Sequence, residues 1–240
     1  MGRFLVMMGL CLAVAVGAAQ AEAPRVAWRV VERSGNAIPL YKNSHATAAA
    51  WVTAYHGLKK PGETDKELIS ALWVRMQTCD CDAPGKPTVW NIYMGMKDLF
   101  SARGYPGTGF KQRCRYSEEE AQIAGFDDYT SRIRANLPVV VTLCYEPEAK
   151  RGLGRASRRV SKCFSLAGIG HLIYNDQKFL ICHDGIDPEA EYAAKLDRVD
   201  PAVLGLPTAG KPWGQSGTSL YRWDGQYTNL VLLFVGTPSK

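Results

Sequence analysis

The sequence predicts an α+β fold in which N-terminal helices pack on a C-terminal antiparallel β-sheet. Two observations predict this class. Helical periodicity dominates from about residue 47 to residue 136, and short apolar runs typical of strands follow from residue 138 onward. Of the 240 residues, 46% are hydrophobic and 22% are charged, which excludes a disordered, collagen-like or low-complexity protein. We therefore expect one globular domain around one core.

The first predicted elements are a short strand over 26–31, expected at a sheet edge, and a series of helices. Thr64 and Glu67 form a capping box, in which a hydroxyl and a carboxylate satisfy free N–H groups at a helix start. Apolar residues at helical spacing and glycines placed as terminators predict the remaining helices. The predicted helices cover 47–56, 64 to about 76, 88–104, a short segment from Ser117, and 128–136.

The second half of the chain carries the predicted sheet. The predicted strands cover 138–143, 172–174, 179–182 and 230–235. The two middle strands are expected to form a hairpin through the polar turn at 175–178. Residues 187–217 are rich in proline and glycine, and we expect them to be irregular.

The N-terminus has the features of a signal peptide. Arg3 precedes an apolar run over 4–16, and Ala19-Gln20-Ala21 fits a small-residue cleavage pattern. We expect cleavage after Ala21 and a product, residues 22–240, exported to the periplasm or the medium. The apolar run is short for a membrane span and no similar run follows, so we expect no membrane span after cleavage. The oligomeric state is left open.

Export favours disulfides over metal ligation for the cysteines of the product. Cys144 and Cys163 end one strand and precede the next, so an antiparallel hairpin would pair them. Cys114 is expected to pair with Cys79 or Cys81, and the state of Cys182 is left open. The single residue between Cys79 and Cys81 does not match the usual zinc spacing, and we expect neither a metal nor another cofactor.

A basic stretch lies between Cys144 and Cys163. A solvated surface loop is the interpretation we favour, and contact with an anionic ligand is the alternative. No aromatic residue lies among these charges and the net charge of the chain is only +6, so no nucleic-acid partner is expected. The six basic residues are Lys150, Arg151, Arg155, Arg158, Arg159 and Lys162.

Three residues that are far apart in the sequence have the chemistry of a catalytic triad. Ser44 opens the first helix, His171 begins a predicted strand and Asp184 ends the next strand. Adjacent strands would bring His171 and Asp184 together, and the helix could place Ser44 against His171 as nucleophile, base and orienting acid. Each residue also has a structural interpretation, as a helix cap, a buried strand histidine and a turn residue, respectively.

Further motifs accompany this order. Ser44-His45-Ala46 opens the first helix, Tyr55-His56-Gly57 closes it, and Gly104-Tyr105 ends the third helix. A helix runs into Asn136-Leu137-Pro138 and the strand after it, and Gly170-His171 is followed by a strand that closes on Asp184. Over roughly residues 41–235 this pattern resembles the papain-like cysteine peptidases, in particular the bacteriocin-processing (double-glycine) peptidase-like domains. The resemblance implies a papain-like fold, with Ser44, His171 and Asp184 at the catalytic positions.

The departures from the family concentrate at the nucleophile. Ser44 takes the place of the family's cysteine, and its Gly-Pro continuation is missing. Ile38 falls about where the family carries an oxyanion-binding glutamine, and Asn43 is a weak candidate to replace it. A site shaped for a thiolate is poorly suited to a serine hydroxyl, and one lost oxyanion donor costs on the order of a hundredfold in rate.

Two functional hypotheses follow, and whether the protein is an enzyme is left open between them. The favoured one is an exported, degenerate peptidase homologue that binds a peptide-like or anionic ligand in its former active-site cleft. The alternative is an active peptidase or amidase that uses Ser44, His171 and Asp184. A third possibility is a disulfide-stapled envelope protein without a cleft function. Cys182 is better explained as a core or disulfide cysteine, and His45 and His56 as surface or helix-packing residues. His183 should face opposite to Asp184, which makes it a poor triad member.

Overall fold

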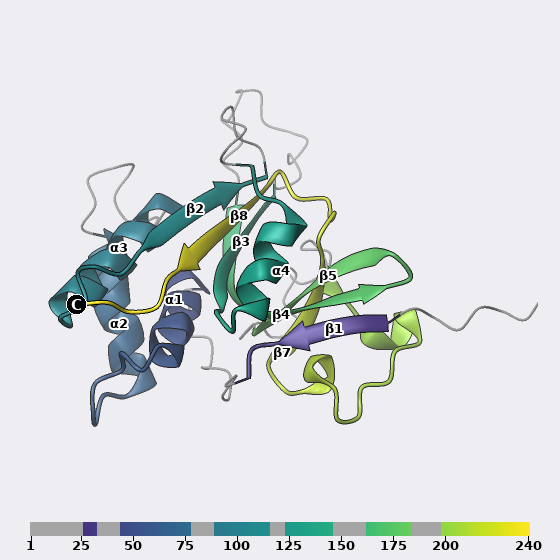
Figure 1. Ribbon diagram of the computed structural model, residues 1–240, viewed down its shortest axis with the longest axis horizontal. Helices are drawn as coiled ribbons and strands as arrows, with labels where there is room; N and C mark the ends of the chain where they lie inside the picture. Colours follow the sequence, from purple (N-terminus) through teal and green to yellow (C-terminus); the bar gives the residue numbers. More distant parts are fainter. Residues whose placement is uncertain (1–25, 33–43, 78–88, 116–122, 146–161, 184–197) are drawn as a thin grey trace, which may run out of the picture.

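The computed structural model describes residues 26–32, 44–77, 89–115, 123–145, 162–183 and 198–240. Over these residues the chain is a mixed α+β fold with four α-helices and one eight-stranded antiparallel sheet (Figure 1). Several sequence predictions lie outside the described residues. These are the signal peptide, the helix from Ser117, Cys79, Cys81, Asp184, and the basic residues Lys150, Arg151, Arg155, Arg158 and Arg159.

Three consecutive helices form a layer against one face of the sheet: α1 (Ser44–Tyr55), α2 (Asp65–Gln77) and α3 (Val89–Ala102). The predicted capping box opens α2, because the Thr64 N–H donates to Glu67 Oε2 at 2.7 Å and the Glu67 N–H donates to Thr64 Oγ1 at 3.2 Å. Helix α1 begins three residues before its predicted start. It is buried from Ala46 to Thr53, because its small alanines allow close packing between the sheet and the other helices.

The sheet is built around its longest strand, β4. Its strand order is β2-β8-β3-β4-β5-β7-β6, and β1 pairs with β4 beside this path. The first part of β4 pairs with β3, and the part after Gly168 pairs with β1. The strands are β1 (Val26–Val30), β2 (Phe110–Cys114), β3 (Val139–Tyr145), β4 (Lys162–Tyr174), β5 (Gln177–His183), β6 (Arg198–Val199), β7 (Thr218–Arg222) and β8 (Asn229–Val235).

The predicted hairpin is confirmed, and so are the strand over 26–31 and the final strand. Asn175 and Asp176 turn the chain between β4 and β5 with positive φ values of 47° and 63°. β4 is much longer than predicted, since residues 162–171 also belong to it. Strands β2, β6 and β7 were not predicted from the sequence.

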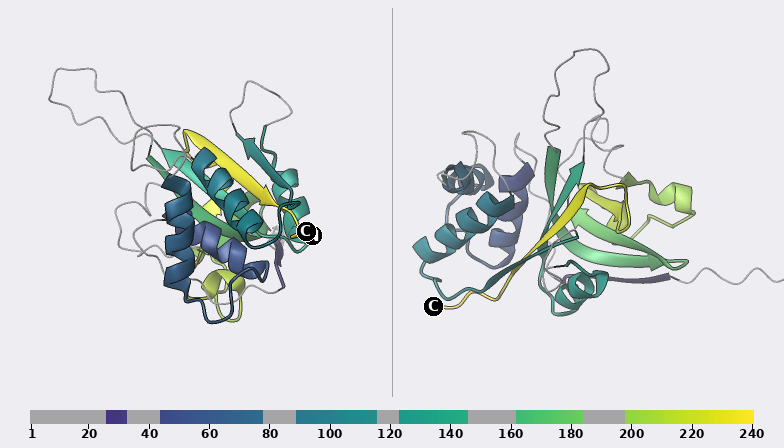
Figure 2. Two further views of the ribbon diagram at one scale, coloured as in Figure 1. Left: turned by 90° about the vertical axis from the view of Figure 1, so that its left-hand side faces the viewer. Right: turned by 90° about the horizontal axis from the view of Figure 1, so that it is seen from above.

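Helix α4 (Phe126–Arg134) covers the other face of the sheet (Figure 2). The Asp128 carboxylate accepts the N–H of Gly125 at 3.1 Å, so the helix begins two residues before its predicted start. Tyr129 is fully buried and donates its hydroxyl to the carbonyl of Gly170 at 2.7 Å. We call the two faces the α1 face and the α4 face.

The predicted Cys144–Cys163 disulfide is confirmed. The two cysteines are directly opposite each other in the β3–β4 register, with Cα atoms 4.0 Å apart. Cys114 is a free thiol, so its predicted disulfide with Cys79 or Cys81 is not observed. Cys114 ends the unpredicted strand β2, and its Sγ lies 3.8 Å from Gln112 Nε2, while Cys79 and Cys81 lie outside the described residues. Within the described ranges, no helix is both long and apolar enough to cross a membrane.

Candidate functional site

The N-terminus of α1 is attached to the centre of the sheet by four polar side chains, which we call the α1–sheet cluster: Ser44, His45, Thr142 and Ser165. Ser44 Oγ accepts the backbone N–H of Ser165 at 3.2 Å. The Ser165 hydroxyl lies 2.6 Å from His45 Nδ1 and 2.7 Å from Thr142 Oγ1. Ser44 therefore lies at the start of α1, as predicted, and the strand residue that contacts it is Ser165.

The cluster follows from the strand register and from the composition of α1. Thr142 and Ser165 are paired across β3 and β4, so their side chains project from the same face of the sheet. They are 1% and 3% exposed, respectively, and buried hydroxyls require hydrogen-bond partners. Because α1 is rich in alanine, it can approach β4 closely enough for Ser44 and His45 to provide some of these bonds.

Burial keeps His45 neutral. Desolvation lowers the pKa of His45 to about 4, so the ring is uncharged at neutral pH. With its proton on Nε2, the ring accepts the Ser165 hydroxyl at Nδ1, and Ser165 in turn accepts the hydroxyl of Thr142. The same chain of groups joins helix α1 to two strands, so it stabilises the position of the helix N-terminus.

His171 lies elsewhere on the sheet. It is in the middle of β4, opposite Leu180 of β5 and Arg29 of β1, and its ring centroid is 6.1 Å from that of Phe126 in α4. The step of six residues along β4 from Ser165 to His171 spans roughly 20 Å at about 3.3 Å per residue. The predicted hydrogen bond between Ser44 and His171 is therefore wrong.

A β-bulge in β4 also places His171 on the opposite face from Ser165. Gly168 pairs with Cys182 and Gly170 pairs with Ile181, so Ile169 is an extra residue in β4. Without it, two residues six positions apart would share a face. With it, Ser165 faces α1, whereas His171 faces α4. The sequence has no unambiguous signal for this bulge beyond the two glycines.

The α1 face carries a second histidine. His183 is the last residue of β5, and its ring centroid lies 4.9 Å from that of Trp51 in α1. Its Nδ1 is 3.2 Å from Thr218 Oγ1. In the β4–β5 register His183 pairs with Ala167, which lies four positions before His171 on β4. Asp184 follows it directly but lies outside the described residues.

Sequence reasoning missed three members of this site. It treated His45 as a packing residue, and it did not consider Thr142 or Ser165. Adjacent His45 and Ser44 at a helix start gave a weak signal. Ser165 gave none, because it lies in a part of β4 that was not predicted to be a strand.

The cluster has few features of a catalytic centre. Ser165 and His45 form a serine–imidazole hydrogen bond, but Ser165 is only 3% exposed and its Oγ has a further polar neighbour in Thr142. The carbon atom of a substrate must come into contact with a nucleophile, and the buried Ser165 hydroxyl does not allow this contact. The described ranges contain no group of three His, Cys, Asp or Glu side chains that could hold a metal ion.

The basic stretch is connected to the same region. Lys162 begins β4 opposite Tyr145, the last residue of β3. The Cys144–Cys163 disulfide lies two residue pairs from the Thr142–Ser165 pair in the ladder, so the two ends of the segment 146–161 join the sheet near the α1–sheet cluster. The other five basic residues lie outside the described residues.

No protein-family model matches the chain, and a search of curated proteins finds no significant match.

Proposed function

We propose that the chain is an exported, papain-like peptidase homologue that has lost peptidase chemistry and binds a peptide-like or anionic ligand at the N-terminus of α1. One observation carries the proposal: the group on β4 that contacts Ser44 Oγ is the backbone N–H of Ser165, a hydrogen-bond donor that cannot act as a general base. An α1 helix whose N-terminus meets the central strand of an antiparallel sheet agrees with the papain-like resemblance.

The hydrogen bonds of Ser44 support the loss of catalysis. A serine hydroxyl becomes a nucleophile when a base takes its proton during attack. Ser44 Oγ instead accepts a backbone N–H, while His45 Nδ1 is bonded to Ser165. The hydrolase alternative with Ser44, His171 and Asp184 receives no support from the position of His171, roughly 20 Å along β4 from the partner of Ser44.

The expected ligand follows from charge. Six basic residues between 150 and 162 belong to a segment that the Cys144–Cys163 disulfide closes beside the cluster. Free N–H groups and the dipole at the N-terminus of α1 also favour negative charge. An acidic peptide satisfies both features, and it is the ligand class we propose.

A labelling experiment tests the loss of catalysis. The protein is incubated with a serine-directed fluorophosphonate beside an active serine hydrolase, and its mass is measured. We expect no adduct on Ser44. An adduct on Ser44 that disappears in the His171→Ala variant would establish the hydrolase alternative.

A binding experiment tests the ligand. A fluorescein-labelled decaglutamate peptide is titrated with the protein at low salt, and anisotropy is measured. We expect saturable binding that the Arg155→Gln/Arg158→Gln/Arg159→Gln variant weakens at least about tenfold. A matched variant with Lys66→Gln, Lys97→Gln and Lys111→Gln, remote from this segment in sequence, should bind as the unmodified protein does. Equal loss in both variants would show only non-specific charge attraction.

A further inference from the structure

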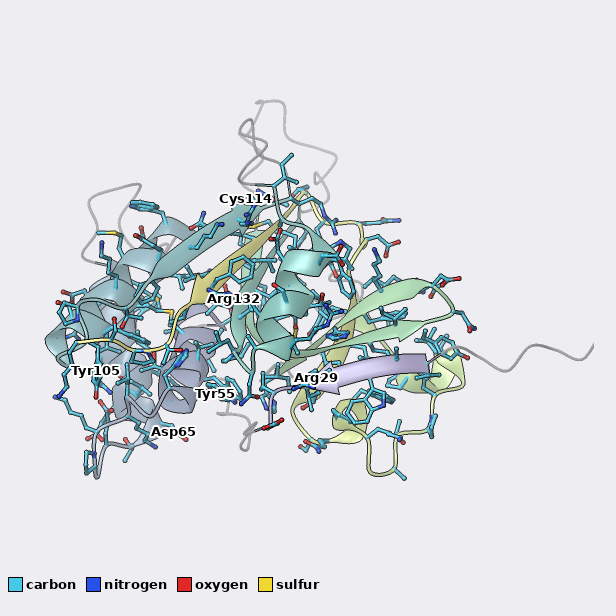
Figure 3. The ribbon with its side chains drawn as sticks, viewed as in Figure 1. Arg29, Tyr55, Asp65, Tyr105, Cys114 and Arg132 are labelled. Atoms are coloured by element: carbon cyan, nitrogen blue, oxygen red, sulfur yellow. A yellow bond between two sulfur atoms is a disulfide. The ribbon has the colours of Figure 1, made fainter. Side chains whose placement is uncertain are left out.

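The α4 face carries a second group of functional side chains, centred on His171. Arg29 is directly opposite His171 in the β1–β4 pair, so the two side chains project from the same face with Cβ atoms about 5 Å apart. Figure 3 marks Arg29 on β1, beside the end of α4. Asn136 just after α4 accepts the N–H of Glu32 at 2.6 Å, which ties this end of the helix to β1. Arg134, the last residue of α4, therefore lies near Arg29.

His171 carries an unsatisfied polar atom at this place. The residue is only 6% exposed, and its ring packs edge-on against Phe126. Its Nδ1 is buried, and no group in the described part of the chain forms a hydrogen bond with it. Buried polar atoms in folded proteins almost always have a partner, so an unpaired ring nitrogen needs an explanation.

The surroundings of His171 are positively charged. Burial is the largest cause that lowers the pKa of His171, and the positive charges of Arg134 and Arg29 lower it further. Both arginines are exposed. Lys178 adds a third cation, with its Nζ 5.3 Å from the Phe126 ring centroid. The acidic neighbour is Glu32, 3.7 Å from Arg29, and because both side chains are exposed this pair is weak.

We propose that Arg29, Arg134 and the Nδ1–H of His171 form a binding site for a phosphate group. Guanidinium groups match phosphate oxygens with paired N–H donors. A neutral imidazole with its proton on Nδ1 adds a donor at the atom that lacks a partner. The site is on the other face of the sheet from Ser44, so it does not depend on the proposed function.

The test follows His171 by NMR in ¹⁵N-labelled protein at pH 7. Sodium phosphate is added against sodium chloride of equal ionic strength, and the His171→Phe variant assigns the ring signals. We expect a saturable shift of the His171 Nδ1 signal with phosphate and none with chloride. Arg29→Gln and Arg134→Gln should each weaken phosphate binding at least about tenfold, since each removes charge-assisted hydrogen bonds.

Arg222→Gln is the matched control, because Arg222 pairs with Phe179 and so projects from the opposite face to His171. It should change phosphate affinity by less than about twofold. A phosphate on a lipid headgroup has the same chemistry, so vesicles with and without phosphatidic acid form a second arm. Binding in the vesicle arm alone, lost with Arg29→Gln, would assign the site to lipid phosphate. No saturable response in either arm, or equal weakening by Arg222→Gln, would overturn the proposal.

Discussion

Ser165 links three elements through one short side chain. Its hydroxyl contacts His45 and Thr142, and its backbone N–H bonds to Ser44. Because all of these groups are buried or partly buried, removal of the hydroxyl leaves polar atoms without partners. The residue is thus more important for the position of α1 than its size suggests.

We predict that Ser165→Ala destabilises the protein by about 1–3 kcal/mol, the usual cost of unpaired buried polar groups. Urea unfolding followed by circular dichroism measures the change. Ser101→Ala, at an exposed position of α3, is the control and should stay within about 0.5 kcal/mol of the unmodified protein. Equal stability of both variants would show that the cluster does not hold α1.

Two partly buried histidines predict a loss of stability in acid. Burial lowers the pKa values of His45 and His56 to about 4, whereas an unfolded histidine titrates near pH 6.5. Between these values the unfolded chain binds more protons, so stability falls as the pH decreases and is constant for these groups above about pH 7. From pH 7.5 to pH 5 we expect a loss of up to about 2 kcal/mol for each histidine.

Urea midpoints at several pH values between 5 and 7.5 test this prediction, because carboxylates contribute little in that range. His45→Gln should have a shallower pH dependence than the unmodified protein. A pH dependence that His45→Gln leaves unchanged would show that His45 titrates normally in the folded state.

At the same scale, the sequence predicted the residue types of the site better than their contacts. Ser44 begins α1 as expected, and His171 is in β4. The predicted contact between them is not formed. Spacing along a strand predicts which face of the sheet a side chain occupies only when the strand contains no inserted residue. His45 and Ser165 were missed because nothing local in the sequence reports a hydrogen bond between a helix and a distant strand.

Among the elements, β4 has the largest effect on where side chains lie. Its bulge at Ile169 is flanked by Gly168 and Gly170, and both glycines are closely packed. A Cβ on Gly168 would lie 2.8 Å from the Tyr129 hydroxyl and from Val141 Cγ2. A Cβ on Gly170 would lie 2.6 Å from the carbonyl oxygen of Arg29. These contacts explain why glycine is present at both positions.

We predict that Gly168→Ala destabilises the protein by about 1–3 kcal/mol, because the buried Tyr129 and Val141 must shift. Gly109→Ala is a matched control, since a Cβ there would have no atom within 4 Å. Thermal or urea unfolding of both variants measures the difference. If Gly168→Ala were as stable as Gly109→Ala, the close packing of α4 on the bulge would be refuted.

Elements with strong local signals were predicted from the sequence, and those without were not. The capping box at Thr64 and Glu67 and the turn at Asn175 act through neighbouring residues, so they can be recognised locally. β2 has the sequence Phe-Lys-Gln-Arg-Cys and exists because β8 offers it a hydrogen-bonding edge. Such a strand depends on tertiary pairing that polar residues do not indicate.

For the whole molecule, the Cys144–Cys163 disulfide is a covalent link that limits the conformations of the unfolded chain. Its cysteines are 19 residues apart in the sequence. In the chain-entropy model, a loop of this length gives about 3 kcal/mol of stability. We predict that the Cys144→Ala/Cys163→Ala variant loses about this amount in denaturant unfolding, while Cys114→Ser, which alters a free thiol, loses less than about 1 kcal/mol. Equal losses would contradict the role of the disulfide.

The global arrangement separates two chemistries on the two faces of one sheet. The α1 face carries Ser44 and a neutral hydrogen-bonded cluster, and the α4 face carries His171 near two arginines. The class of fold was predicted because the spacing of apolar residues distinguishes helices from strands. The placement of Ser44 and His171 on opposite faces of the sheet was not predicted, because it depends on the register of β4 with three other strands.

The most direct test of the account is the reactivity of a thiol placed at position 44. The rate of iodoacetamide alkylation of Ser44→Cys is measured against pH by mass spectrometry of the peptide that contains it. A neighbouring imidazole would lower the pKa of the thiol and increase its reactivity near neutral pH. Because the backbone N–H of Ser165, and not the His171 ring, contacts this position, we predict that adding His171→Ala leaves the profile unchanged. A profile that collapses when His171 alone is replaced would contradict the account.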